Sequence, residues 1–286
     1  MLYELVKNNN AKISLNSACE AIGVSKSGYI AHSKQSPESK ELYNQIRAIT
    51  NEYKRYGYRR VTKELKRRHI IVNHKKVLKT MRNHDLLCKK RRLFVKTTDS
   101  KHGLPVYPNL TRGLEIVQPN QLWAADITYV QLSNGFVYLA VILDVFSRKC
   151  IGWQLSRNID AQLCIDALAK AFEERDGADL TGLTHHSDQG VQYASNEYTA
   201  ALKERGIAIS MSRRGNPYDN AFAESFMKTF KYEEVYMSEY ESYNDALNNI
   251  ERFIEQVYNQ KRLHSGIGYM PPAEFEQQYK LKEEVA

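Results

Sequence analysis

The sequence predicts an α/β fold: a mixed five-stranded sheet with helices, preceded by small helical modules. The first observation is the order of apolar segments after residue 119, which have the lengths of three strands, a helix, a strand, a helix, a strand and a helix. The second is the segregation of charge. Residues 1–118 contain 25 Lys and Arg against 9 Asp and Glu, whereas residues 119–286 contain 16 against 24. An acidic α/β domain therefore follows a strongly basic helical part.

The basic balance of residues 1–118 favours nucleic-acid binding, because each neutralised phosphate releases counterions. A solvated basic surface is the alternative. The longest apolar run, 136–143, is far shorter than the ~20 residues of a membrane span, and the N-terminus lacks a signal-peptide pattern. The four cysteines have no metal-site spacing and fit free thiols. We expect a cytoplasmic protein that binds nucleic acid and no membrane.

Residues 1–37 are predicted to form an N-terminal helix-turn-helix. Ser17 begins a short helix, Gly23 suits the turn, and Ser25 caps a second helix that ends near Lys34. In this motif the first residues of the second helix contact base edges. The predicted DNA contacts are Ser25, Lys26 and Tyr29. A helical hairpin that serves only packing is the alternative.

Residues 38–87 are predicted to form a second basic helical module that binds DNA. Apolar residues at helical spacing begin it, a helix is expected at 61–68, and Asn73 caps another at 74–82. Guanidinium groups bind phosphates, and the nearby tyrosines, Tyr56 among them, can pack on sugars. The predicted DNA contacts are Tyr58, Arg59, Arg60, Lys63 and Arg67. A solvated face is again the alternative.

Residues 88–118 are predicted to be a linker. A basic run at 89–92 opens it, and three of the seven prolines of the chain lie at positions 105, 108 and 119. Proline-containing basic segments are extended and can lie along DNA. Lys90 and Arg91 are the predicted contacts.

Residues 119–235 are assigned to the α/β core, and 236–286 to a C-terminal amphipathic helix and tail. Strands are predicted at 127–132, 136–145, 150–155, 183–186 and 207–210. Asp160 and Ser195 are expected to cap helices. This order is that of the ribonuclease H-like fold. Right-handed crossovers should bring the start of the first strand near the end of the fourth.

The segment 216–231 is predicted to be a helix that carries a functional carboxylate. Asn216 or Asn220 can cap it. An apolar stripe recurs every four residues and consists of Phe222, Phe226 and Phe230. Glu224 lies off that stripe, and Lys228 and Lys231 share its face.

Two further acids are expected beside Glu224. Asp126 is placed at the start of the first strand and Asp188 after the fourth, with 61 residues between them and 35 between Asp188 and Glu224. Mg²⁺ prefers oxygen ligands, and two ions ~4 Å apart can activate an attacking oxygen and stabilise a leaving one. We predict Asp126, Asp188 and Glu224 as catalytic residues and metal ligands for two Mg²⁺ ions, for which Mn²⁺ can substitute.

The ordinary role of a single Asp at a strand end is a turn or a cap, and we expect it for Asp144, Asp160 and Asp219. A zinc or iron site at His185 and His186 is an alternative. It is disfavoured because neighbouring residues on a strand point to opposite faces.

Several motifs together resemble the OrfB-type DDE transposases of two-frame bacterial insertion sequences, which are related to retroviral integrases. They are Trp123-x-x-Asp-Ile-Thr-Tyr129, Leu143-Asp-x-Phe-Ser-Arg148, His186-Ser-Asp-Gln-Gly190, Ser212-Arg-Arg-Gly-Asn-Pro-Tyr-Asp-Asn220 and Glu224-Ser-Phe226. Tyr56-Gly-Tyr-Arg-Arg60 and the stretch from Tyr258 to Phe275 fit the same family. The resemblance covers nearly the whole chain.

The resemblance implies Asp126, Asp188 and Glu224 as the DDE triad, with Lys231 as the basic residue seven positions after the glutamate. We add Arg213, Arg214 and Lys228 to the predicted DNA contacts. The implied reaction is cleavage at the element ends and transfer of the freed 3′-OH into target DNA, without a covalent protein–DNA intermediate. Implied partners are further copies of the chain on DNA and an upstream-frame OrfA protein, separate or fused. A non-joining nuclease or resolvase and a DNA-binding regulator are the alternatives.

Overall fold

The computed structural model describes residues 19, 20, 23, 25, 26, 37–88, 104–213 and 217–285. The chain divides into two compact units, residues 1–89 and 90–286. Ser25 and Lys26 are exposed, but most of the helix-turn-helix predicted at 1–37 lies outside the described residues. The same holds for four predicted DNA contacts: Tyr29, Lys90, Arg91 and Arg214. Among the described helices, none has the length and apolar character needed to cross a membrane.

The first unit contains three described helices, α4 (Pro37–Glu52), α5 (Tyr58–Arg67) and α6 (His74–Asn83). Apolar residues recur at helical spacing in each of them and lie on the faces that the helices turn toward one another. The fully buried core consists of Ile46, Ile49, Val61, Leu65, Val77 and Met81. Asn73 caps α6 as predicted, because its side chain accepts a hydrogen bond from the Lys75 amide at 2.8 Å.

The second unit is built on a five-stranded mixed sheet with the order β3-β2-β1-β4-β5, which confirms the predicted fold class. The strands are β1 (Leu122–Gln131), β2 (Phe136–Asp144), β3 (Cys150–Ser156), β4 (Thr184–Ser187) and β5 (Ala208–Met211). The first three are antiparallel, while β4 pairs in parallel with both β1 and β5.

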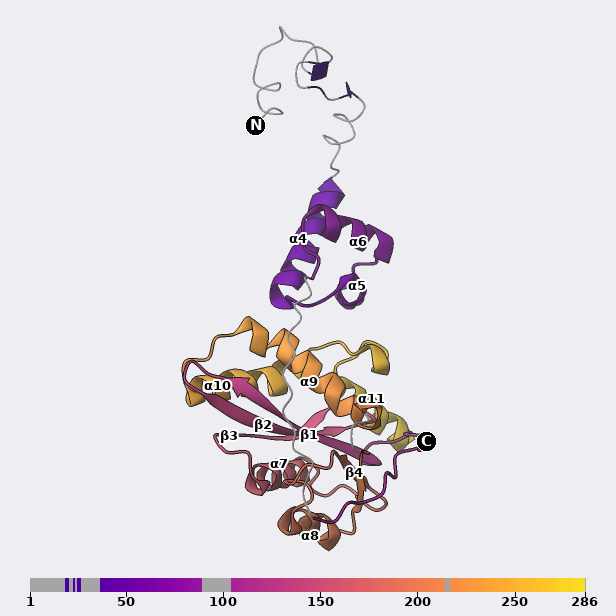
Figure 1. Ribbon diagram of the computed structural model, residues 1–286. Coiled ribbons are helices and arrows are strands. Elements are labelled where there is room, and N and C mark those ends of the chain that lie inside the picture. The colour runs from indigo at the N-terminus through magenta and orange to yellow at the C-terminus, as the bar shows by residue number, and fades with distance from the viewer. Residues whose placement is uncertain are drawn as a thin grey trace. The chain divides into compact units, whose positions relative to one another are not determined.

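Helices cover both faces of this sheet (Figure 1). On one face lie α7 (Ala161–Glu174) and α8 (Asn196–Glu204), capped by Asp160 and Ser195 as predicted. On the other lie α9 (Ala221–Glu233), α10 (Tyr243–Glu251) and the π-helical segment η3 (Arg252–Tyr258). The remaining elements are η1 (Pro217–Asn220), η2 (Val235–Met237), η4 (Ser265–Ile267) and α11 (Pro272–Val285).

Strand β1 corrects one expectation about Asp126. The strand begins at Leu122 and not near residue 127, so Asp126 lies at mid-strand. The reason is that β1 is central: Trp123, Ala124 and Ala125 are all buried, which removes the alternation that marks a half-exposed strand. The parallel register pairs Ala124 with His186, so the end of the short strand β4 does lie beside the residues at which the first strand was expected to start.

Gly152 permits the contact between β3 and α7. A Cβ atom at this position would lie 2.3 Å from the Ala167 carbonyl oxygen and 2.8 Å from the Ala171 Cβ. Because both obstacles belong to a packed helix, Gly152→Ala should destabilise the second unit by about 1–3 kcal/mol. Denaturant unfolding followed by tryptophan fluorescence measures this, since both tryptophans, Trp123 and Trp153, lie in this unit. An unchanged midpoint would contradict the close packing.

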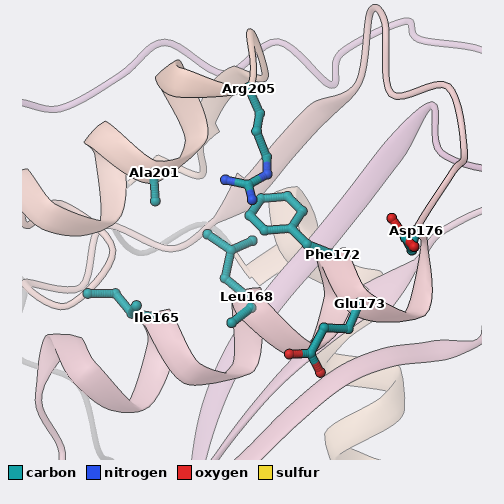
Figure 2. Close-up of a pocket in the computed structure, with 8 residues that line it drawn as sticks. Ile165, Leu168, Phe172, Glu173, Asp176, Ala201 and Arg205 are labelled. Atoms are coloured by element: carbon teal, nitrogen blue, oxygen red, sulfur yellow. The ribbon is translucent and has the colours of Figure 1, made fainter.

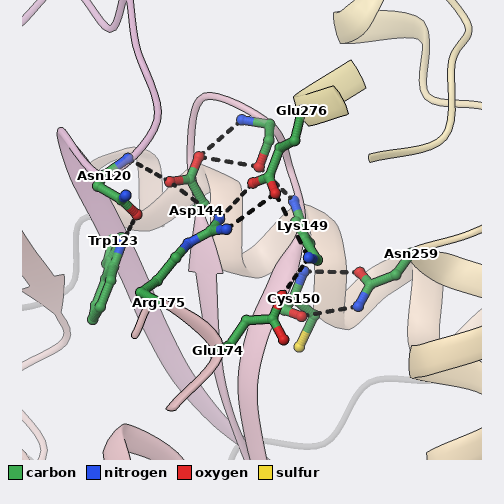
Figure 3. Close-up of polar contacts among 10 residues, drawn as sticks. Asn120, Trp123, Asp144, Lys149, Cys150, Glu174, Arg175, Asn259 and Glu276 are labelled. Atoms are coloured by element: carbon green, nitrogen blue, oxygen red, sulfur yellow. Dashed lines mark hydrogen bonds and ion pairs between the residues drawn. The ribbon is translucent and has the colours of Figure 1, made fainter. Parts of the chain in front are cut away.

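A buried ionic network attaches α11 to the sheet (Figure 3). Arg175, at the end of α7, forms a two-pronged ion pair with Glu276 of α11 and lies 3.8 Å from an Asp144 oxygen. Asp144 also accepts hydrogen bonds from the amides of Asn120 and Ser147. Asp144 therefore has the structural role expected for it. Nearby, Asn259 donates to the Cys150 carbonyl and accepts from its amide.

Candidate active site and nucleic-acid interface

The parallel pairing of β1 with β4 brings Asp126 and Asp188 to the same part of the sheet. The register pairs Ala124 with His186, and two residues further along each chain stand Asp126, still in β1, and Asp188, the residue that follows β4. Asp188 Oδ1 accepts a hydrogen bond from the Gly190 amide at 2.9 Å. A Cβ at Gly190 would lie 2.9 Å from that oxygen, which explains the glycine in the turn.

Helix α9 runs alongside β1. At its start, Asn220 Nδ2 donates to the Ala125 carbonyl at 3.0 Å, and near its end Lys231 Nζ lies 4.6 Å from the centre of the Tyr129 ring. Glu224 stands one turn after Asn220, a rise of about 6 Å, which brings it level with the part of β1 that contains Asp126. Glu224 is exposed.

The helix differs from the prediction in two respects. It begins with the 3₁₀ turn η1, and the Asn220 side chain makes no capping hydrogen bond. Instead that side chain tethers the helix to β1. In the predicted apolar stripe, Phe226 and Phe230 are buried, but Phe222 is partly exposed.

The three acids interact electrostatically at Asp126. Burial raises the pKa of Asp126 to about 7, and the negative charges of Asp188 and, more weakly, Glu224 act in the same direction. A hydrogen bond from the Ile127 amide and the charge of Lys231 oppose the rise in this pKa. The pKa of Glu224 is raised by burial alone. Asp126 therefore responds to its charged neighbours, whereas Glu224 shows no such contribution.

The described residues contain no group of three or more His, Cys, Asp or Glu side chains gathered closely enough to hold a metal ion. The donor set nevertheless fits a hard cation, because the predicted ligands are all carboxylates. Burial and, after it, repulsion by Asp188 and Glu224 raise the pKa of Asp126, and a bound cation would offset both effects. The triad as a metal site stays a prediction.

The neighbouring histidines face opposite sides of β4, as the sequence indicated. His185 Nε2 lies 2.9 Å from the Tyr198 hydroxyl, and His186 Nδ1 lies 2.8 Å from Ser210 Oγ. The two rings therefore cannot share a zinc or iron ion.

Burial of His185 makes the fold sensitive to acid. Burial lowers its pKa to about 3, whereas an exposed histidine titrates near 6.5. In the native state His185 stays neutral, while in the unfolded chain it gains a proton below pH 6.5. Its contribution to the free energy of unfolding is therefore complete above that pH and falls as the pH drops toward 3. In this range the free energy of unfolding should fall by roughly 1.4 kcal/mol per pH unit. His185→Gln should remove this contribution to the slope of unfolding free energy between pH 6 and 4. Equal slopes in both proteins would contradict the assignment.

The predicted basic residues of the second unit differ in their surroundings. Arg213 Nε lies 3.3 Å from Asp219 Oδ2, so this exposed guanidinium has a carboxylate partner, and Asp219 has the ordinary role expected for it. Lys228 is exposed, whereas Lys231 is half-buried and its pKa is lowered by burial.

The first unit presents a basic face on α5. Arg59, Lys63 and Arg67 are exposed. Arg60 and Tyr58 are half-buried, and the Arg59 guanidinium lies 5.7 Å from the centre of the Tyr58 ring.

Two neighbours of this basic face make contacts within the first unit instead. Tyr56 is buried and stacks on Tyr53, so its suggested packing on sugars is wrong. Arg68 forms ion pairs of 2.8 Å with Glu52 and Glu64.

A cavity of about 540 Å³ lies between α7 and α8, where Arg205 lies over Phe172 at 3.9 Å (Figure 2). None of the residues that line it is a predicted site residue. The volume of a cavity alone therefore does not identify the catalytic region of this fold.

The chain matches three protein families. The family described as "Integrase core domain" matches residues 117–217, and a second family with the same description matches residues 205–272. The family described as "HTH-like domain" matches residues 37–94. The first two matches span the sheet and α9, and the third spans α4 to α6.

The chain is also similar to named transposases. It is 40% identical over 246 residues to the transposase for insertion sequence element IS904 of Lactococcus lactis, covering 85% of this chain and 96% of that protein. It is 34% identical over 285 residues to transposase InsF for insertion sequence IS3A of Escherichia coli K12, covering 96% and 98%. The solved catalytic core domain of BIV integrase is similar at 20% identity and a TM-score of 0.43, covering 58% of this chain and 99% of that one.

The family matches give one architecture, an HTH-like domain followed by an integrase core domain. The relatives align over almost their entire length. The chain therefore belongs to the IS3 family of insertion-sequence transposases.

Proposed function

We propose that this transposase cleaves DNA at the ends of its insertion sequence and joins the freed 3′-OH to target DNA, using Asp126, Asp188 and Glu224 with divalent metal. The observation that carries the proposal is the pairing of β1 with β4, which sets Asp126 beside Asp188, with α9 alongside. DNA transposition itself is the activity of the family.

Asp126 and Asp188 would hold the metal from the sheet, and Glu224 would hold it from α9. Bound Mg²⁺ supplies Lewis-acid stabilisation of the charge that develops on the phosphodiester oxygens. The Gly190 amide fixes one oxygen of Asp188. Lys231 supplies a half-buried positive charge near Asp126, suited to a DNA phosphate beside the acids.

A strand-transfer assay tests this proposal. Oligonucleotide duplexes with the terminal repeats of the element are incubated with protein and a target plasmid, with and without Mg²⁺. We expect joined products only with the metal. Hydrolysis without joining would indicate the nuclease alternative, and binding without either reaction would indicate a regulator.

We further propose that the basic face of α5 contacts DNA phosphates through Arg59, Lys63 and Arg67. Arg59→Ala should weaken binding about uniformly across sequences and reduce the salt slope by about 1, because one fewer phosphate is neutralised. Filter binding or anisotropy at several salt concentrations measures both.

Arg68→Gln is the matched control, since Arg68 is already paired with Glu52 and Glu64. The slope of this variant should stay close to that of the wild type. If Arg59→Ala leaves the slope unchanged, Arg59 does not belong to the DNA interface.

We also propose that the active form is a homo-oligomer on DNA and that an upstream-frame OrfA protein takes part. Family membership supports both expectations. Sedimentation with and without terminal-repeat DNA measures the first, and transposition with and without the upstream frame measures the second.

A further inference from the structure

A second, smaller cavity lies beside the proposed active site. Its volume is about 280 Å³, and it is enclosed by residues 111–116, the first half of β1, His186 of β4 and the start of α9. His186 stands two residues before Asp188, about 7 Å along the chain, and Asn220 stands one helical turn before Glu224. The cavity therefore lies next to the proposed active site, both at β4, which leads to Asp188, and at the start of α9, which carries Glu224.

Two residues that line this cavity each have a buried polar atom without a partner in hydrogen-bond geometry. Ser210 Oγ accepts a hydrogen bond from the Leu110 amide, so its own hydrogen is available to His186 Nδ1, which leaves the ring proton on Nε2. His186 Nε2 and Asn220 Oδ1 have no partner in hydrogen-bond geometry, although the His186 ring interacts electrostatically with Asp219. His186 is 2% exposed and Asn220 is 7% exposed. The lining residues thus include one donor and one acceptor that are buried without a full hydrogen bond, which is rare in native proteins.

The remaining walls are mixed in character. Leu114, Ile116, Leu122 and Phe222 form the apolar part, and Thr111, Arg112 and Asp219 form the polar part. A single water requires only about 10–15 Å³ of such space, so the cavity exceeds a bridging water many times over. A flat heterocycle with both a donor and an acceptor on its edge matches this combination of apolar walls and polar groups.

Arg148 indicates the chemical class of the ligand. Its guanidinium lies 4.2 Å from the centre of the Phe222 ring, its Nε is buried without a hydrogen-bond partner, and the structure shows no ion pair for it among the described residues. Its backbone has a φ of +66°, which is strained for a residue other than glycine. A strained, half-buried cation beside the cavity favours a ligand that carries a phosphate, and hence a nucleotide over an uncharged heterocycle.

We infer that this cavity binds one unpaired base of the transposon-end or target DNA, with the Arg148 guanidinium near the phosphate of the same nucleotide. The inference rests on the proposed function, because it requires DNA at the carboxylates. Enzymes that act on a base within a duplex extrude that base and bind it by edge hydrogen bonds and stacking, which shows that a protein pocket can hold an extruded base. An extruded base here would fix the position of the backbone relative to Asp126 and Asp188.

The test uses terminal-repeat duplexes with 2-aminopurine placed singly at each position around the cleavage point, in EDTA so that no cleavage occurs. The fluorescence of this base rises when it leaves the base stack. We expect the wild type to raise the signal several-fold at one position. No rise at any position would overturn the inference and leave a cavity that holds only water.

Leu114→Trp fills the cavity from its outer wall, and Leu110→Trp is the matched control on the same segment, because Leu110 is exposed and does not line the cavity. Leu114→Trp should abolish the fluorescence rise and bind the duplex roughly tenfold more weakly, whereas Leu110→Trp should match the wild type. An abasic site at the responsive position should remove the difference in affinity between Leu114→Trp and the wild type. A Leu114→Trp protein that keeps the full signal would overturn the inference.

Strand transfer measured in Mg²⁺ separates this inference from the proposed function. Missing joined products would refute the function, whatever the fluorescence. Normal joining without any fluorescence change would refute the base site alone.

Discussion

Asp126→Asn, Asp188→Asn and Glu224→Gln should each reduce strand cleavage and joining by about three orders of magnitude or more. Each substitution removes one negative charge and one ligand from the proposed metal site. A loss of about 4 kcal/mol of transition-state stabilisation, the scale of metal-assisted charge stabilisation, corresponds to a thousandfold lower rate. The measurement is the initial rate of joining of terminal-repeat duplexes into plasmid in Mg²⁺.

Glu197→Gln is the matched control for Glu224→Gln. Glu197 is an exposed acid in the first turn of α8, as Glu224 is in the first turn of α9. The control should retain wild-type rates, and all four variants should bind DNA about as well as the wild type. Substantial joining by any one of the three triad variants would remove that residue from the catalytic site.

Glu276→Gln should destabilise the second unit by about 3–5 kcal/mol. The substitution removes the carboxylate that forms the two-pronged ion pair with the buried Arg175 and leaves only the more distant Asp144, and a poorly compensated buried charge is strongly unfavourable. The Arg175 pair also joins α11 to the end of α7 (Figure 3), so the attachment of α11 should weaken with it. Urea unfolding followed by tryptophan fluorescence reports on this unit alone, because Trp123 and Trp153 both lie in it.

Two comparisons make this result specific. The double variant Arg175→Met, Glu276→Leu removes both charges and should be more stable than Glu276→Gln, because a buried pair is replaced by apolar contact. Glu52→Gln, which breaks the partly exposed pair with Arg68, should cost less than about 1 kcal/mol by the thermal unfolding of the first unit. A Glu276→Gln protein as stable as the wild type would show that the network does not hold α11.

Much of the local structure followed from short-range patterns. Asn73, Asp160 and Ser195 cap the helices that they were expected to cap, because a cap depends only on residues two or three positions away. The order of strands and helices was likewise predictable from apolar periodicity. The starts of the strands were less predictable. β1 begins five residues before the predicted position, because a strand that is covered on both faces shows no alternation of apolar and polar residues.

The roles of individual polar residues were decided by contacts across the fold. The sequence suggested Asn220 as a helix cap, but its side chain donates a hydrogen bond to the carbonyl of Ala125, 95 positions away. Arg68 and Arg213 belong to basic clusters in the sequence, yet both have carboxylate partners in the structure. Arg148 stood within a recognised motif without an assigned role, and only its strained backbone and missing ion pair distinguish it.

The sequence by itself determined the family and the element order and predicted the three acids, since these depend on residue identity and spacing along the chain. Only the tertiary structure decided that Asp126 stands at mid-strand beside Asp188, that Glu276 secures α11, and that a polar cavity adjoins the acids. The physical reason is the separation along the sequence of the residues that interact. Periodicity and capping act over a few residues, whereas the register of parallel strands and a buried ion pair join residues from 60 to about 100 positions apart, which no local pattern encodes.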